Sequence, residues 1–338
     1  MTDTFDTMMN KFLVPLETLT GGVKDSVYFL RRDGCFVFSH GYYHPHPGEF
    51  IGKIIYYPTP EGTADIWGRR YEAMHKAWVG GEHVAILNDV QIVKHYEIDP
   101  RLDPSRPRPL VADFTLEFPL EEFLGYFDPH HSLIECTALH PVVGEWVEKT
   151  SALFDFPREK MGVTGSLAYG KIEEADMDFD VIFAGSMEEN ARVIERIREL
   201  VRDPSRQVFE FGKYWPIRTY HEGFLICPFF VYENVADAPL GGRDRVRLVR
   251  DGVEGRGTVA DDSHSCYLPI VLDLEDVVFA GGETRGHLRL ICYDGSIRGE
   301  YRRGETVAFD RGRLLEVERD GRPTEALALD FHKYLARV

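Results

Sequence analysis

The run from Met161 to Gly185, MGVTGSLAYGKIEEADMDFDVIFAG, constrains the fold of this chain more than any other feature. Asp178 and Asp180 stand two residues apart, directly before the apolar run Val181–Ala184. Side chains two positions apart on a strand point to the same side. The pattern therefore predicts a strand that carries both carboxylates on one face and continues into a buried core.

A Gly-Ser pair, Gly165 and Ser166, precedes the two aspartates, with eleven residues between. Carboxylates are the hard oxygen ligands that Mg²⁺ prefers, and substrate phosphates usually complete its coordination shell. A glycine turn lets backbone N–H groups approach a phosphate, and a nearby helix N-terminus adds a favourable dipole. The combination predicts a site for a phosphorylated ligand and Mg²⁺, with Mn²⁺ as the alternative metal.

Two segments, Gly162–Ser166 (GVTGS) and Asp178–Gly185 (DFDVIFAG), carry a family resemblance. They resemble the DNA-polymerase-β-like nucleotidyltransferases, in particular uncharacterised archaeal and bacterial members. Met177 stands where those proteins have Ser, and weaker similarity extends to His40–Pro45 and Gly304–Leu314. The resemblance implies an α+β fold and transfer of a nucleoside monophosphate from an NTP to an acceptor. It leaves the acceptor open between an RNA end, a protein and a small molecule.

The resemblance also assigns roles within the site. Asp178 and Asp180 are expected to hold Mg²⁺, and Gly165 and Ser166 to hold the triphosphate. Lys171 and Lys213 are the nearest cations for the phosphates. Asp176, two residues before Asp178, offers a competing Asp-x-Asp register, but the apolar run and Gly185 fit the pair Asp178 and Asp180.

A third carboxylate is the open question. Two-metal phosphoryl transfer normally uses one more acid to hold the second ion and to deprotonate the nucleophile. No Asp occurs between Ser205 and Ala236, where later strands are expected, so the choice lies among Glu210, Glu222 and Glu233. Glu222 is our candidate catalytic residue. A chain without a third carboxylate would be a single-metal enzyme, or a non-catalytic nucleotide- or RNA-binding protein on a degenerate nucleotidyltransferase fold.

Composition bounds the class of protein. A chain of 338 residues with 43% hydrophobic side chains can form two or three folded domains. The five widely spaced cysteines and the absence of a basic leader segment favour reduced thiols in a cytoplasmic protein. The longest apolar run, Phe224–Tyr232, is too short to span a bilayer.

The net charge of −17 opposes strong binding to duplex DNA, which depends on phosphate neutralisation by Lys and Arg. Arginines cluster at 243–250 and 298–313, but acidic residues alternate with them. This alternation favours solvated strand faces over a nucleic-acid surface. Local contact with RNA through these basic strands remains the alternative.

Three regions are expected along the chain. Residues 1–110 form a strand-rich N-terminal module, residues 111–240 the nucleotidyltransferase-like core, and residues 241–338 a small antiparallel β-barrel similar to OB-type barrels. In the barrel, Tyr293, Tyr301 and Phe309 are the candidates for stacking on single-stranded nucleic acid. The expected strands are Val27–Arg31, Cys35–Phe38, Phe50–Tyr57, one in His83–Tyr96, Gln207–Phe211, Phe224–Tyr232, Thr258–Val259, Ile270–Leu274, Val277–Phe279, Leu288–Tyr293, Ile297–Tyr301, Thr306–Phe309, Arg313–Glu318 and Leu327–Phe331.

Helices are expected at Trp67–Ala77, Phe118–Tyr126, Leu133–Phe154 and Met187–Arg202, and an extended linker at Asp99–Pro109. His40, His44 and His46 lie within seven residues and could bind Zn²⁺. The neighbouring prolines favour instead a turn that sets the N-terminal module against the catalytic sheet.

Overall fold

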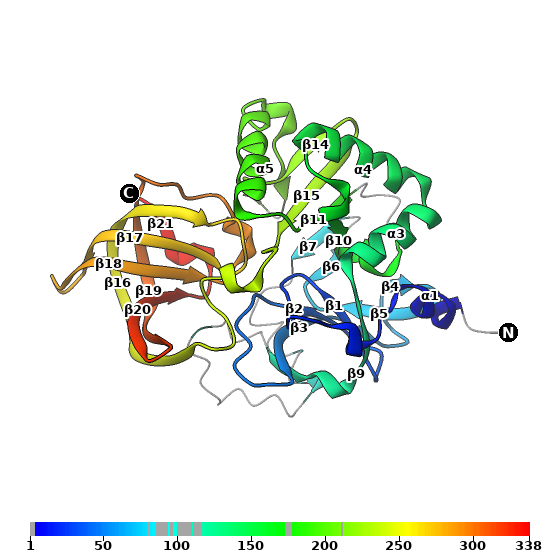
Figure 1. Cartoon of the computed structure of the whole chain (residues 1–338), viewed down its shortest axis with the longest axis horizontal. Coiled ribbons are helices and arrows are strands. Elements are labelled where there is room, and N and C mark those ends of the chain that lie inside the picture. Colours follow the sequence, from blue (N-terminus) through cyan, green and yellow to red (C-terminus); the bar gives the residue numbers. More distant parts are fainter. Residues whose placement is uncertain are drawn as a thin grey trace.

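The computed structural model describes residues 4–79, 82–85, 94, 97–99, 110, 116–172, 178–210 and 212–338. These residues form a mixed α+β protein with three parts. A strand-rich N-terminal sheet lies next to a small central sheet with helices, and the C-terminal strands gather at the opposite end of the molecule (Figure 1).

The N-terminal sheet has seven strands, in the order β4-β5-β3-β2-β1-β9 with β8 also paired to β3. The predicted strands near residues 28, 36 and 50 are confirmed, and β1 and β2 form the expected hairpin. The sheet also includes β8 and β9, so it extends along the chain to Phe127, beyond the end of the N-terminal module expected at residue 110. Its strands are β1 Tyr28–Arg31, β2 Phe36–Ser39, β3 Glu49–Pro58, β4 Ala64–Ile66, β5 Arg69–Ala73, β8 Leu116–Pro119 and β9 Phe123–Phe127, and helix α1 Thr4–Phe12 lies against it.

Two helices expected in this part are wrong. Residues of Trp67–Ala77 form β5 and the start of β6 (Lys76–Val79), and residues of Phe118–Tyr126 form the end of β8 and most of β9. Burial alternates with a period of two in β5 and β8, because pairing with β3 places every second side chain in the core, and pairing with β1 holds β9 as a strand. Strand pairing thus decides the conformation where local pattern was ambiguous.

Strand β6 pairs with β7 (Glu82–Ala85) in a separate ribbon. β7 overlaps the start of the strand expected in His83–Tyr96, whose remainder lies mostly outside the described residues. The linker expected at Asp99–Pro109 also lies outside them except for Asp99, which forms a buried ion pair with Arg31 at 2.7 Å.

The central sheet has the order β10-β11-β15-β14. The aspartate strand is confirmed as β11 (Asp178–Phe183), antiparallel to β10 and parallel to β15. Phe179, Val181 and Phe183 point to the helix side, where Phe179 contacts Trp146 of α4, so Asp178 and Asp180 point to the opposite side. The other strands are β10 Met161–Val163, β14 Thr219–His221 and β15 Phe224–Phe230, beside the hairpin β12 Phe209–Glu210 and β13 Lys213–Tyr214.

The helices of this part largely follow the prediction. α5 (Met187–Leu200) is confirmed and begins with a capping box between Ser186 and Glu189. The long helix expected at Leu133–Phe154 is two helices, α3 (Pro129–Leu139) and α4 (Pro141–Phe154). Pro141 explains the break, because proline fits the first turn of a helix but not its interior.

The C-terminal strands close into a ring, since β16 pairs with both β17 and β19. Pairs of short predicted strands merge into the long strands β17 and β19. Ile297–Tyr301 is not a strand: it begins in the turn Gly295–Ile297 and continues into a loop. The strands are β16 Arg245–His264, β17 Ile270–Phe279, β18 Thr284–Cys292, β19 Thr306–Arg319, β20 Arg322–Leu329 and β21 Leu335–Arg337.

The side chains of Tyr293, Tyr301 and Phe309 are buried, at 2%, 3% and 3% exposure, and so offer no outer stacking face. All five cysteines are buried and free, as the sequence predicts. Within the described residues, no helix has the length and apolar character needed to cross a membrane.

Candidate functional site

Asp178 and Asp180 face a cavity of about 890 Å³ that all three parts of the chain line. Both carboxylates are partly buried, and they project from the same face of β11. The sequence-predicted aspartate pair therefore opens onto a space large enough for a nucleotide, since small-molecule sites commonly measure about 300–1,000 Å³.

The Gly-Ser pair lies directly against the aspartates. Thr164 N–H donates to the Asp180 backbone carbonyl at 3.0 Å, and Gly165 follows in the left-handed region with φ +62°. A Cβ added at Gly165 would stand 1.9 Å from Asp180 Oδ2. Only glycine fits there, and Ser166 lines the same cavity.

The pKa of Asp180 reflects the poor solvation of its carboxylate. Burial raises the pKa of Asp180 to about 6, while the positive charges of Arg218 and Lys76 partly oppose this shift. Glu210 adds to the rise in the pKa through like-charge repulsion. A carboxylate held in such surroundings gains from a bound cation, and perturbed acids of this kind are typical of functional sites.

The strand next to the aspartates carries no third acid. β15 runs parallel to β11 and places Leu225 beside Asp178 and Cys227 beside Asp180. Glu210 on β12 is the one candidate glutamate that lines the cavity, where it forms an ion pair with Arg218.

The other two candidate glutamates lie elsewhere. Glu222, our candidate from the sequence, pairs with Lys149 of α4 at 3.1 Å and does not line the cavity. Glu233 pairs with Lys160 at 3.2 Å. The competing Asp176 falls outside the described residues.

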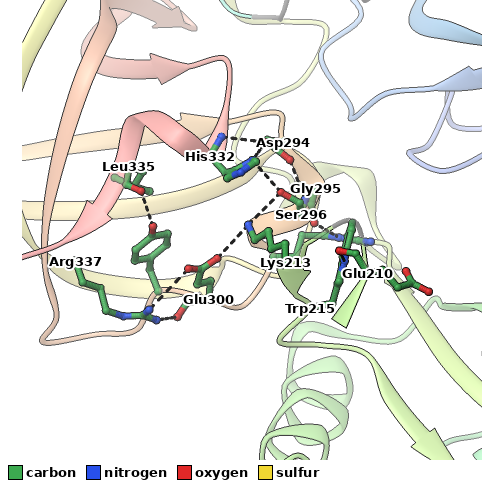
Figure 2. Close-up of polar contacts among 12 residues, drawn as sticks. Glu210, Lys213, Trp215, Asp294, Gly295, Ser296, Glu300, His332, Leu335 and Arg337 are labelled. Carbon is green, nitrogen blue, oxygen red and sulfur yellow. Dashed lines mark hydrogen bonds and ion pairs between the residues drawn. The ribbon is translucent and has the colours of Figure 1, made fainter. Parts of the chain in front are cut away.

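The two predicted phosphate-binding lysines separate. Lys213 lines the cavity and is held by Glu300 at 3.3 Å and by Ser296 Oγ at 3.2 Å (Figure 2). Lys171 lines a different, smaller cavity of about 400 Å³, together with Trp67 and His140. Only Lys213 of the pair therefore lies where it could meet a ligand of the aspartates.

Several cavity residues have no signal in the sequence, because they come from distant segments that the fold brings together. The N-terminal module contributes Asp25 and Ser26, and Ser26 adopts the strained φ of +65°. The Ser26 carbonyl accepts the Thr164 hydroxyl at 2.8 Å, which fixes this turn beside the Gly-Ser pair. The remaining charged side chains that the sequence did not indicate are Lys53, Lys76, Arg218, Asp294, Arg298, Glu300 and Asp330.

Asp25 is the second acid with a strongly raised pKa. Burial raises the pKa of this carboxyl to about 6, against hydrogen bonds from Ser26 Oγ and Gly41 N–H, each at 2.7 Å. The bond from Gly41 ties the turn at residue 41 to the cavity.

Asp294 organises the part of the cavity that residues 293–301 and His332 line. It accepts hydrogen bonds from His332 Nδ1 at 2.6 Å, His332 N–H at 2.9 Å and Ser296 N–H at 3.0 Å (Figure 2). Burial acts to raise the pKa of Asp294, but its hydrogen bonds outweigh burial and hold that pKa well below the usual range.

The three histidines of the sequence cluster do not converge. His40 Nε2 contacts the Tyr293 carbonyl at 3.1 Å, and His44 bonds the Val23 carbonyl and the Ile51 N–H. His46 lies on the surface, and its ligand nitrogen is within 4.8 Å of carboxylate oxygens of Glu49 and Glu117. A zinc site built from the three histidines is therefore wrong. The expected turn against the catalytic sheet is not what these contacts show, because His40 reaches the C-terminal part of the chain and His44 stays within the N-terminal part.

Comparison of the chain with known protein families, with curated proteins and with solved structures finds no match. The family resemblance accordingly stays a prediction.

Proposed function

We propose that the protein is a metal-dependent nucleotidyltransferase that moves a nucleoside monophosphate from an NTP to an acceptor. The close approach of Gly165 to Asp180 carries this proposal. It places a turn suited to phosphate beside two carboxylates on one wall of a nucleotide-sized cavity. A turn that served only to connect two strands would not need this contact.

The residues of the cavity fit a divalent cation of the Mg²⁺ class. Asp178 and Asp180 offer hard oxygen ligands, and Glu210 is the nearest further acid on the cavity surface. Bound there, the ion would neutralise phosphate charge and orient the attack on the α-phosphorus. Glu210 takes the role for which the sequence suggested Glu222.

The triphosphate would lie along Gly165 and Ser166. Arg218 and Lys76, whose positive charges act on Asp180, would be the counter-charges of the phosphates. Arg218 stacks on Trp215 at 4.0 Å, which holds its guanidinium toward the cavity. Its guanidinium also forms an ion pair with Glu210, so a bound phosphate would share the planar fork of this arginine with that carboxylate.

The C-terminal ring is, in this proposal, a small barrel similar to OB-type barrels that closes the cavity. Its strand closure and five principal strands support this. Its arginines mostly pair with neighbouring acids, as Arg247 does with Glu316 and Arg250 with Glu283. The ring therefore serves the acceptor side of the cavity, and RNA contact through basic strands is the secondary alternative.

A non-catalytic nucleotide-binding protein on the same fold is the second candidate. The placement of Cys227 beside Asp180 favours it, because the strand next to the aspartates then supplies no acid for a second metal ion. Such a protein would bind NTP with a metal but release no pyrophosphate.

Pyrophosphate release from each of the four NTPs, with Mg²⁺ or Mn²⁺ and with cellular RNA or a small-molecule extract as acceptor, tests the proposal. We expect release from the wild type and none from the Asp178→Asn, Asp180→Asn double variant, which keeps the shape of both side chains. Metal-dependent NTP binding without release from the wild type would favour the non-catalytic candidate. Equal pyrophosphate release by the double variant would exclude Asp178 and Asp180 as the metal ligands.

A further inference from the structure

Arg298 is a buried cation that forms no ion pair with any residue that the structure describes. Its side chain lines the cavity, and the residue is 8% exposed. Its Nε donates to the Gly295 carbonyl at 3.2 Å, and its guanidinium lies 4.6 Å from the ring centroid of Phe229. No residue that the structure describes forms an ion pair with it.

Several other charged groups that line the cavity form ion pairs. Lys213 pairs with Glu300, Arg218 with Glu210, and Asp294 with His332. Asp25 exerts an attraction on Arg298, but its two oxygens already accept hydrogen bonds from Ser26 and Gly41. Arg298 thus differs from these paired groups, because no acid among the described residues forms an ion pair with it.

Burial of an uncompensated guanidinium is costly, because the protein replaces the water that solvates the charge. This cost lowers the pKa of Arg298, and its partial relief by Asp25 does not cancel the effect. Stacking on Phe229 and the bond to Gly295 fix the plane of the group. An oxyanion in that plane would recover the cost through two parallel hydrogen bonds.

The position of Arg298 separates it from the Gly-Ser turn. It lies over Phe229, which pairs with Ile182, two residues beyond Asp180 on β11. Residues two apart on a strand are separated by about 7 Å. Gly165 instead contacts Asp180 from the side of β10. A group bound at Arg298 is therefore displaced from the triphosphate turn along the sheet.

We propose that Arg298 anchors a second oxyanion subsite in the cavity, which holds a carboxylate or phosphate group of the acceptor molecule. That the bound molecule is the acceptor rests on the proposed function, whereas the presence of an oxyanion subsite does not. The acceptor is then a small acidic molecule that carries its own anionic group some distance from the reacting hydroxyl.

Binding of inorganic phosphate and of acetate, each against chloride at equal ionic strength, tests the subsite by calorimetry and thermal shift. We expect wild-type protein to bind at least one of the two, and Arg298→Gln to lose about 10- to 100-fold in that affinity. Arg298→Lys keeps the charge without the planar fork and should fall between them. Arg303→Gln, an exposed arginine of the same loop region, is the matched control and should bind as the wild type does.

The two anions distinguish the sources. Preference for phosphate indicates a phosphorylated acceptor, and preference for acetate indicates a carboxylic acid. A second measurement requires no variant: the anion is titrated into wild-type protein that is saturated with a non-hydrolysable NTP and Mg²⁺. Affinity that is unchanged by the nucleotide supports two subsites, whereas competition assigns Arg298 to the triphosphate and overturns the proposal. Absence of anion binding by the wild type also overturns it. If NTP fails to bind at all, the proposed function fails while the anion result stands.

Discussion

The two sides of the cavity shift the pKa of a buried acid in opposite directions. The cavity floor, made of β11, β15 and the Gly165–Ser166 turn, holds Asp180 with its pKa raised by burial to about 6. The cavity wall, made of residues 293–301 and His332, holds Asp294 with hydrogen bonds that outweigh burial and keep its pKa well below the usual range. Both acids line the same space.

This difference in pKa indicates which side of the cavity would be stabilised by a bound ligand. On the floor, the folded protein bears the cost of the poorly solvated Asp180 carboxylate, a cost that a bound cation would relieve. On the wall, the acid stabilises the fold by joining two loops through three hydrogen bonds. Functional sites commonly carry such unrelieved cost, which is offset by packing elsewhere.

The largest expected effect is on turnover and falls on Glu210. Glu210→Gln should bind NTP and Mg²⁺ yet lose about 10²–10⁴-fold in pyrophosphate release, because an amide cannot accept the acceptor proton. Glu222→Gln should stay close to wild type, since that side chain pairs with Lys149 outside the cavity. Steady-state kinetics with separate NTP titrations measure both. An equal loss in the two variants would make Glu222 a catalytic candidate again. It would also remove the distinction between an acid that lines the cavity and one that lies outside it.

The next effect concerns the fit of the floor. Gly165→Ala should weaken metal-dependent NTP binding by about 100-fold, because its Cβ would displace the Asp180 carboxylate. Gly223→Ala is the matched control: it has φ +89° with open space around it, so it carries only the backbone cost of about 1–2 kcal/mol. Calorimetric titration and melting temperature together separate binding from folding. Similar binding losses in both variants would reduce the role of Gly165 to backbone strain.

Sequence reasoning located the floor because its signal is local. Asp178, Asp180 and the apolar residues after them lie on one strand, and strand periodicity alone fixes which face they share. The Gly-Ser turn lies next to the aspartates through a hydrogen bond from Thr164 to the Asp180 backbone, as the motif implied.

The wall escaped prediction because its residues act through pairing across distant segments. Ile297–Tyr301 has the composition of a strand, yet Asp294 draws it into a turn that packs on His332. The third acid was misjudged for the same reason, since only the tertiary position of the β12 hairpin brings Glu210 to the cavity. The helix expected at Trp67–Ala77 failed because pairing with β3 and β4 overrides local pattern.

Removal of the floor carboxylate should stabilise the protein at neutral and alkaline pH. The pKa of Asp180 is raised from 3.8 to about 6, so its contribution to stability is complete below pH 4 and is lost as the pH rises through 6. Asp180→Asn should therefore be more stable than wild type by up to about 3 kcal/mol above pH 7, and nearly equal to it at pH 4. Urea unfolding across this pH range gives the difference curve, from which the parallel titration of Asp25 cancels. A destabilised variant at high pH would show that the floor carboxylate is satisfied.

The smallest expected effect has the opposite sign and falls on the wall. The folded-state pKa of Asp294 is lowered, so its contribution to stability is present above the unfolded value of 3.8 and declines as the pH falls below it. Asp294→Asn should lose about 1–3 kcal/mol at neutral pH, because an amide oxygen cannot serve His332 and Ser296 as a charged carboxylate does. Asp310→Asn, at an exposed acid of the same C-terminal region, should change stability by no more than about 0.5 kcal/mol. Urea unfolding at neutral pH and at about pH 3 should show the Asp294 difference narrow on acidification, since below pH 3.8 the unfolded wild type takes up a proton on this residue while the folded wild type keeps its carboxylate charged. A difference that widens in acid would mean that the wall carboxylate, like that of the floor, is held against its preference, and the contrast between the two sides would disappear.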